Sequence, residues 1–293
     1  MKIATAKDIL LIKETHNLNL FEIALQYEVS NSDLDQDVIV NTMARQWQIM
    51  KQAITLGLDP DNQHLHGKIL GREAIKLKTS FESGKSICGV TTSKAIMYAL
   101  STMEVNMAMG QIVAAPTAGA SGVLPGTLKA LQETYHLEDS KIIEALFVAG
   151  LVGMIIAKQA SISGAKGGCQ AEIGSAASMA AAATVYVLDG TMEQSFDAAA
   201  IAINNMMGLI CDPVAGLVEV PCHKRNALGA ANALLCAEMV LAGLPSMIPF
   251  DEVVQAMKQV GDLLPACHRE TATGGIAISK TAKAIEARIM NEA

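Results

Sequence analysis

The chain has 293 residues with 29 acidic and 22 basic side chains, which gives a formal net charge of −7. That length is enough to bury the core of one large domain, and an acidic balance lacks the basic surface that nucleic acids and anionic membranes attract. With 51% hydrophobic and 17% charged residues, the chain is also too apolar to be intrinsically disordered.

The N-terminal part predicts three capped helices followed by a polar segment. Thr5, Asn19 and Ser32 each stand three positions before an acidic residue, which is close to the capping-box spacing at a helix start. After the third of them, apolar residues recur at helical spacing up to Gly57. Residues 59–89 are polar and rich in glycine, so we expect an ordered excursion over the surface with room for a small strand or helix.

The rest of the chain predicts helices that are separated by Gly- and Pro-rich loops. We expect helices over about 93–109, from Thr127 onward, and over about 140–160, 175–189, 192–209, 226–242, 250–264 and 281–291. Loops of unusual composition lie at 161–174, 210–224 and 265–280. No segment alternates with the period of two that indicates a strand. The sequence therefore predicts an all-α fold, with residues 1–293 forming one compact helical domain of buried central helices and Gly/Pro-rich cysteine loops.

Membrane insertion and secretion are both disfavoured. The longest apolar run without a charge, 145–157, is shorter than the about 20 residues that a membrane-spanning helix needs. The first residues carry charges at Lys2, Lys7 and Asp8, and they lack the apolar stretch of a signal peptide. Six cysteines in so long a chain do not indicate a disulfide framework, so we expect a reduced, cytoplasmic protein.

Three cysteines mark the unusual loops. Cys169 ends a Gly-rich run, Cys211 precedes an Asp-Pro pair, and Cys222 follows Pro221. Thiolates on such loops can converge on an inorganic centre, because the backbone there can approach it closely. Their spacing is neither that of a zinc finger nor that of a ferredoxin. Cluster ligands and ordinary buried cysteines both remain open on these residues alone, whereas Cys236 lies in a helical pattern and is expected to fill the core.

The loop over 117–126 is a second candidate site. Its glycines run into a helix start, where free N–H groups and the hydroxyls of Thr117 and Ser121 could hold a carboxylate or a phosphate. The loop matches neither a Walker motif nor a dinucleotide-binding fingerprint. A plain turn between two helices explains the pattern equally well.

Two further residue types could carry chemistry. His64 and His66 would face the same way in an extended segment, and each is a candidate base, although a solvated loop explains them as well. Lys166 raises the hypothesis of a pyridoxal phosphate Schiff base. The two glycines after it and the absence of an α/β pattern disfavour that hypothesis.

Four motifs in order resemble the α chain of bacterial iron–sulfur L-serine dehydratase. They are APTAGASGVLPG (115–126), SGAKGGCQAEIGSA (163–176), GLICDPVAGLVEVPCHKRNA (208–227) and RETATGGIAI (269–278). The resemblance covers essentially the whole chain. It implies a cytoplasmic, oxygen-sensitive carbon–oxygen lyase of amino-acid catabolism and gluconeogenesis, which converts L-serine to pyruvate and ammonia.

The resemblance also implies a cofactor and a set of site residues. Cys169, Cys211 and Cys222 would bind three irons of a [4Fe–4S] cluster, and the fourth iron would act as a Lewis acid on the serine hydroxyl. The loop over 117–122 would hold the substrate carboxylate. The substrate-binding residues expected on this basis are Thr117, Ser121, Gly122, Lys166 and Arg225.

Two departures from single-chain members of that family bear on partners and on the base. Those members carry an additional N-terminal domain, so the resemblance implies a separate β subunit and a hetero-oligomer. The histidines usually assigned as the base would then lie on that subunit, and His66 is the candidate base on this chain. Single-chain members also have a C-terminal cysteine that can cap the open iron, and this chain has none after Cys267.

Two alternative functions remain open at this stage. A related iron–sulfur lyase acting on L-cysteine or L-threonine would use the same open iron. A helical interaction subunit without a cluster would need only buried cysteines. In neither case does the sequence indicate a nucleic acid or a membrane as a partner.

Overall fold

The computed structural model describes residues 2–292, and within that range it contains thirteen α-helices and no β-strand beyond isolated bridges. The predicted all-α class is therefore confirmed. In chain order the helices are α1 (Ala6–His16), α2 (Leu20–Asn31), α3 (Gln36–Gly57), α4 (Glu73–Glu82), α5 (Gly89–Met107), α6 (Val123–Tyr135), α7 (Asp139–Gln159), α8 (Gly164–Gly167), α9 (Ser175–Val187), α10 (Met192–Asn204), α11 (Cys222–Leu241), α12 (Phe250–Leu263) and α13 (Lys280–Glu292).

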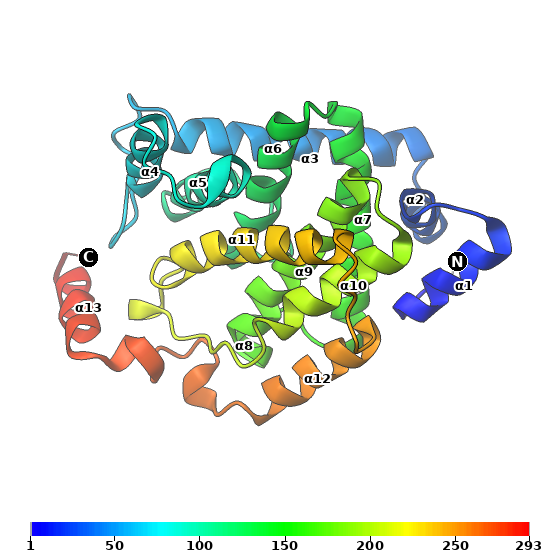
Figure 1. Ribbon diagram of the computed structural model, residues 1–293. Coiled ribbons are helices and arrows are strands. Elements are labelled where there is room, and N and C mark those ends of the chain that lie inside the picture. Colours follow the sequence, from blue (N-terminus) through cyan, green and yellow to red (C-terminus); the bar gives the residue numbers. More distant parts are fainter. Residues whose placement is uncertain (1, 293) are drawn as a thin grey trace.

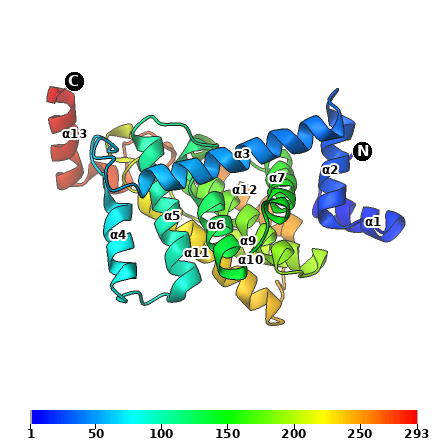
Figure 2. The ribbon, with the colours of Figure 1, turned by 90° about the horizontal axis from the view of Figure 1, so that it is seen from above.

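Helix α9 forms the centre of the molecule. It packs against α6, α7, α10 and α11, and Figure 1 shows it in the middle of these helices. Figure 2 shows α3 crossing above them, with α1 and α13 at opposite ends of the molecule. Two of the three predicted cysteines are adjacent to these central helices, since Cys222 begins α11 and Cys169 precedes the turn that leads into α9.

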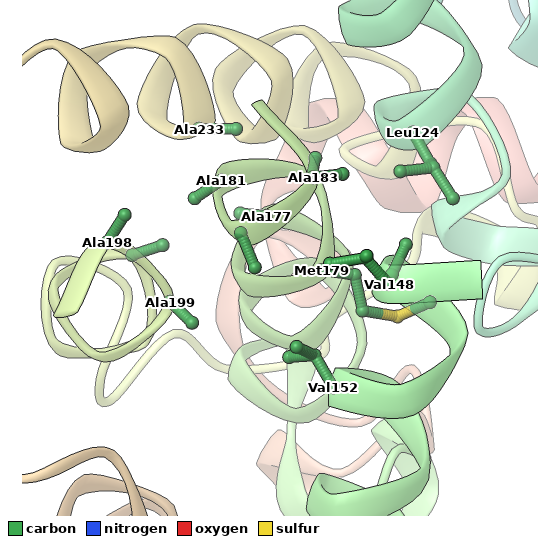
Figure 3. Packing of buried hydrophobic residues seen from close by; sticks show 14 of the residues in the cluster. Leu124, Val148, Val152, Ala177, Met179, Ala181, Ala183, Ala198, Ala199 and Ala233 are labelled. Atoms are coloured by element: carbon green, nitrogen blue, oxygen red, sulfur yellow. The ribbon is translucent and has the colours of Figure 1, made fainter. Parts of the chain in front are cut away.

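Small side chains explain why α9 can be surrounded on all sides. Its sequence is rich in alanine, and its buried residues include Ala177 and Ala181. Figure 3 shows these methyl groups beside Ala198 and Ala199 of α10 and Ala233 of α11. An alanine side chain lets two helix axes approach closely, and a dense interior leaves little room for extra atoms. The central contacts are thus fixed by side-chain size.

Helix α7 is the only helix in the described chain that is long and apolar enough to cross a membrane by length and composition. Its most apolar window is 61% buried within the protein, where it packs against α9, α3 and α2. An apolar helix that is covered by other helices is a core helix. This agrees with the interpretation of the 145–157 run as buried.

Two of the three predicted capping boxes are confirmed. The side chains of Thr5 and Asn19 each accept the N–H three residues later, and the acidic side chain there accepts the cap N–H in return. The prediction at Ser32 is wrong, because Ser32 follows the end of α2 and Asp35 precedes the first residue of α3. The acidic residue that suggested the box is itself the cap position.

Several helices begin earlier than predicted. Helix α6 begins at Val123 instead of Thr127, because Pro125 falls in the first turn, where a missing N–H leaves no intrahelical bond unmade. Helix α11 begins at Cys222, so this cysteine is a helix residue rather than a loop residue. The polar excursion over 59–89 contains α4 and one isolated bridge.

Candidate active site around three buried thiols

Three cysteines from distant parts of the chain share one buried region. Cys169 precedes a π-helical turn, η2 (Gln170–Gly174), Cys211 lies in the segment after α10, and Cys222 begins α11. Their side chains are 1%, 2% and 6% exposed. An ionised Cys169 raises the pKa values of the other two thiols, which places the three groups within electrostatic reach of one another.

Burial is the largest influence on the acidity of these thiols. It raises the pKa of Cys169 to about 11 and that of Cys222 to about 12, and it raises the pKa of Cys211 as well. The Arg225 guanidinium lowers the pKa values of Cys169 and Cys222, whereas the Glu172 carboxylate raises all three. Such thiols hold their protons at neutral pH, so a metal centre would bind by displacing them.

The structure allows the three thiols to be compared with known kinds of metal site. Within residues 2–292, no group of three His, Cys, Asp or Glu side chains is arranged to hold a metal ion. An iron–sulfur cluster has several irons and sulfides between its thiolates, which therefore stand farther apart than the ligands of a single ion. Gly164 lets the backbone approach Cys211 closely, because a Cβ atom there would lie only 3.1 Å from Cys211 Sγ. Buried thiols around such a cradle are the donor set that a cluster requires.

The backbone of Cys211 is held on both sides by one segment near the C-terminus. Its N–H donates to the His268 carbonyl at 2.9 Å, and its own carbonyl accepts the Glu270 N–H at 2.9 Å. Glu270 is exposed, and its charge raises the pKa values of Cys211 and Glu172. The 265–280 loop therefore supports the thiol region, and it brings a second carboxylate to the edge of that region.

A buried ion pair joins the same segment to α11. Arg225 Nη1 donates to the Ile210 carbonyl at 2.7 Å, and Arg225 Nη2 donates to Asp212 Oδ1 at 3.0 Å. The other oxygen of Asp212 accepts the Ile276 N–H at 2.8 Å. The predicted substrate residue Arg225 is thus placed beside the thiols, with part of its hydrogen-bonding capacity used to fix the segment that carries Cys211.

Asn226 fixes the 117–122 loop on α11. Its Nδ2 donates to the Gly119 carbonyl at 2.8 Å and to the Cys222 carbonyl at 2.9 Å, while its Oδ1 accepts the Gly122 N–H at 2.9 Å. One buried amide therefore connects the glycine-rich loop to the first turn of the helix that carries a thiol. The glycine-rich loop is thereby held beside Cys222.

Glu172 lies between the glycine-rich loop and the thiols. Thr117 Oγ1 donates to Glu172 Oε1 at 2.7 Å. A Cβ at Gly119 would lie 3.1 Å from Oε1, and a Cβ at Gly164 would lie 2.9 Å from Oε2. Burial raises the pKa of Glu172, the bond from Thr117 lowers it, and the charge of Glu270 raises it further. A poorly solvated carboxyl group therefore packs closely against the backbone of both glycines.

His66 lies on an exposed turn that is attached to the thiol-bearing segment. Its Nδ1 is 3.0 Å from the Gly67 carbonyl oxygen. The buried Glu219 side chain, which lies between Cys211 and Cys222 in the chain, accepts the N–H groups of residues 68–70 at 2.7–2.9 Å. The structure thus anchors the His66 turn to the segment before α11, with the imidazole on the surface.

Two other predicted residues lie in different surroundings. Ser121 is buried, and its hydroxyl lies 3.5 Å from Met103 Sδ. Lys166 is exposed and lines a cavity of about 240 Å³ with residues of α12, among them Met257 and Asp262. The structure therefore brings together the three cysteines, Thr117 and Arg225, while the Lys166 side chain lines this neighbouring cavity.

Sequence reasoning did not select Glu172, Asp212 or Asn226. Glu172 carried a visible signal, because it is the one charged residue between Lys166 and Asp189. A charge in an otherwise apolar and small-residue segment is costly to bury without a purpose. Asp212 and Asn226 carried no comparable signal, since their roles depend on partners that are distant in the chain.

Comparison with known proteins adds an independent observation. The family model described as serine dehydratase alpha chain matches residues 15–277. The chain is 44% identical over 287 residues to a probable L-serine dehydratase, alpha chain, of Bacillus subtilis, with 98% of this chain and 95% of the relative covered. It is 41% identical over 288 residues to the L-serine dehydratase, alpha chain, of Peptoniphilus asaccharolyticus, with 98% of both chains covered.

A longer relative matches over part of its length. The chain is 34% identical over 276 residues to the L-serine dehydratase of Streptomyces coelicolor, with 92% of this chain and 60% of the relative covered. The matched part of that relative therefore corresponds to almost all of the chain described here, and the relative contains a further region.

Proposed function

The chain belongs to the serine dehydratase alpha chain family, and on that basis we propose that it is the α chain of an L-serine dehydratase. The proposed enzyme is a carbon–oxygen lyase that removes water from L-serine and yields pyruvate and ammonia. The observation that carries the proposal is the meeting of Cys169, Cys211 and Cys222 in one buried region beside a glycine-rich loop.

We propose that these three cysteines hold a [4Fe–4S] cluster. Their burial, their mutual influence on pKa and the close approach of the Gly164 backbone to Cys211 support this assignment. When bound, a cluster with three protein thiolates supplies one iron free of cysteine, which can polarise a hydroxyl group as a Lewis acid. The protein contributes a dry cradle, and the Arg225 guanidinium offsets part of the negative charge of the thiolates.

The proposed reaction is a β-elimination. The α-proton goes to a base, its electron pair forms the carbon–carbon double bond, and the β-hydroxyl group leaves to form water. The resulting aminoacrylate becomes an imine, and water hydrolyses that imine to pyruvate and ammonia without any net oxidation. His66 is the proposed base on this chain, and its turn is held to the thiol-bearing segment by Glu219.

The proposed substrate carboxylate site is the loop over 117–122. Within the described chain, the N–H groups of Ala118 and Gly119 donate no hydrogen bond, so they are free to bind an anion. Ser121 and Gly122 would act by fixing the loop, since they contact Met103 and Asn226. Lys166 stays a proposed substrate residue that would have to reach the site from the neighbouring cavity.

We also propose a β subunit as the partner and the cytoplasm as the location. The Bacillus subtilis and Peptoniphilus asaccharolyticus relatives are both named as alpha chains, which supports an enzyme of more than one kind of subunit. The proposed assembly is a hetero-oligomer. Free, buried cysteines support a reducing compartment.

The decisive experiment is an anaerobic assay of the purified chain, with and without its β partner. L-Serine should give pyruvate and ammonia in equal amounts, and the protein should be brown with about four irons per chain. L-Threonine and L-cysteine are assayed in parallel to test the related lyase activities. A colourless protein that takes up no iron and forms no pyruvate would favour the helical interaction subunit instead.

A further inference from the structure

Glu172 occupies an unusual position in the chain and in the fold. It lies in the π-helical turn η2, between the thiol of Cys169 and the central helix α9. Single π-helical turns occur frequently at functional sites, because the extra residue redirects side chains from the regular helical path. Here the turn directs a carboxylate toward the glycine-rich loop and the thiol region.

The two oxygens of Glu172 have different surroundings. Oε1 accepts a hydrogen bond from Thr117 Oγ1 at 2.7 Å, which fixes the plane of the carboxylate. Oε2 accepts no hydrogen bond from the described chain. It lies 2.9 Å from the point where a Gly164 Cβ would be, and Cys211 Sγ lies 3.1 Å from that same point. The unused oxygen therefore faces the side of the thiol region.

No cation of the described chain balances this carboxylate. None of its ion pairs includes Glu172, and the groups that shift the pKa of Glu172 include Glu270 but no lysine or arginine. The nearby Arg225 is paired with Asp212. A half-buried carboxylate without a counter-ion is unfavourable, and a cationic ligand would remove that cost.

The glycines on either side let the backbone approach the carboxylate closely. A methyl group at Gly119 would lie 3.1 Å from Oε1, and one at Gly164 would lie 2.9 Å from Oε2, so a larger residue at either position would crowd the carboxylate. The unbonded N–H groups of Ala118 and Gly119 lie on the same loop as Thr117. Anion donors and a carboxylate thus stand next to each other, as a zwitterionic ligand requires.

We propose that Glu172 binds the α-ammonium group of the amino-acid substrate through Oε2. This inference rests on the proposed function and extends it by naming a residue that distinguishes an amino acid from a hydroxy acid of the same skeleton. The ammonium donates to Oε2 while the substrate carboxylate lies against the 117–119 backbone. Thr117 then acts as a positioning residue, because it orients the carboxylate through Oε1.

The test compares L-serine with 3-hydroxypropionate, which keeps the carboxylate and the hydroxyl group but lacks the ammonium. The assembled enzyme is measured as wild type, as Glu172→Gln and as Glu270→Gln. The last variant removes a nearby charge that does not contact the proposed ammonium site. Measured quantities are KM and kcat for L-serine, the inhibition constant of 3-hydroxypropionate, and the dissociation constant of L-serine from the change it causes in the visible spectrum of the protein.

Glu172→Gln should raise KM and the spectroscopic dissociation constant for L-serine by about 30-fold or more, because the ammonium loses a poorly solvated charged partner. Inhibition by 3-hydroxypropionate should stay within about threefold of wild type, and iron content should not change. Glu270→Gln should change the affinities for L-serine and 3-hydroxypropionate by less than about threefold. Equal weakening of both ligands in Glu172→Gln, or an unchanged KM, would overturn the inference.

If Glu172→Gln does not assemble, a second variant provides the test. Glu172→Asp keeps the negative charge but moves it away from the proposed ammonium site, because the side chain is shorter. It should therefore weaken the binding of L-serine more than that of 3-hydroxypropionate, and equal weakening of the two would refute the ammonium site. The wild-type assay separates this inference from the proposed function. Wild-type protein that binds iron but forms no pyruvate would refute the function, whereas normal wild-type turnover with an unaffected Glu172→Gln would refute only the inference.

Discussion

Arg225 donates to Asp212 at 3.0 Å and thereby joins the first turn of α11 to the residue that follows Cys211. Both side chains are largely buried, and both have additional backbone partners, at Ile210 and Ile276. Two of the three thiols therefore stand on segments that one ion pair connects. This ion pair should therefore help to hold Cys211 and Cys222 in their relative positions when no metal is bound.

Asp212→Asn should lower the stability of the fold. The amide cannot accept both the guanidinium and the Ile276 N–H, and it leaves the Arg225 charge without its partner. We expect a loss of about 3 kcal/mol in the free energy of unfolding, measured by urea denaturation. The exposed pair Lys258–Asp262 is the control, and Asp262→Asn should cost less than about 1 kcal/mol. Similar losses in the two variants would show that the buried pair has no special role.

Each of the substitutions Cys169→Ala, Cys211→Ala and Cys222→Ala should abolish both iron binding and pyruvate formation. The matched control is Cys236→Ala, since Cys236 is fully buried in α11 and contacts Asn205 and Asn232. That change should leave iron content near the wild-type value while lowering stability modestly. Iron and sulfide analysis of anaerobically prepared proteins provides the measurement. An essential Cys236 would show that the ligand set is wrong.

The sequence predicted the helices better than it predicted their ends. Apolar spacing and caps identified the helical segments, because those signals come from residues close together in the chain. The capping prediction at Ser32 failed, since either Ser32 or Asp35 could precede the helix and only the path of the chain decides between them. Proline at position 125 lies inside a first turn, where sequence alone suggested a loop.

The residues of the candidate site also differ in how far the sequence indicates them. Sequence composition drew attention to Cys169, Cys211 and Cys222, and the resemblance implied that they are cluster ligands. The structure shows that all three are buried, and their role as ligands stays a prediction. Glu172 meets Thr117 across 55 positions, and Asn226 meets Gly119 across 107 positions, so neither contact has a local pattern. Interactions that depend on how distant segments pack become visible only in the folded chain.

Ala181→Leu should destabilise the protein by about 1–3 kcal/mol, because Ala181 is fully buried between α9, α10 and α11. The larger side chain would have to displace α10 or α11 from α9. Ala287 in α13 is exposed and serves as the control, with Ala287→Leu expected to change stability by less than about 0.5 kcal/mol. Thermal and urea denaturation measure both changes. An Ala181→Leu protein as stable as wild type would mean that the centre has room for a larger side chain.

Asp139 should make the stability of the fold depend on pH in the acid range. Burial raises its pKa, but hydrogen bonds from Lys51, Gln132 and Trp47 outweigh burial and hold the pKa of Asp139 well below its usual value. A carboxyl group whose folded pKa is depressed stabilises the protein above its unfolded pKa, near 4, and this contribution is lost as the pH falls through the folded value.

The test is Asp139→Asn, measured by urea denaturation between pH 3 and pH 7. Asp139 is partly exposed and solvent screens the pair, so the variant should be less stable by only about 1 kcal/mol at pH 6. That difference should shrink steadily below about pH 4, because Asp139 then binds a proton in the unfolded wild-type chain but stays ionised in the folded protein. Asp189→Asn, at an exposed pair with Lys141, should show almost no difference at any pH. A difference at Asp139 that stays constant down to pH 3 would show that hydrogen bonding alone, without the carboxylate charge, links α3, α6 and α7 there.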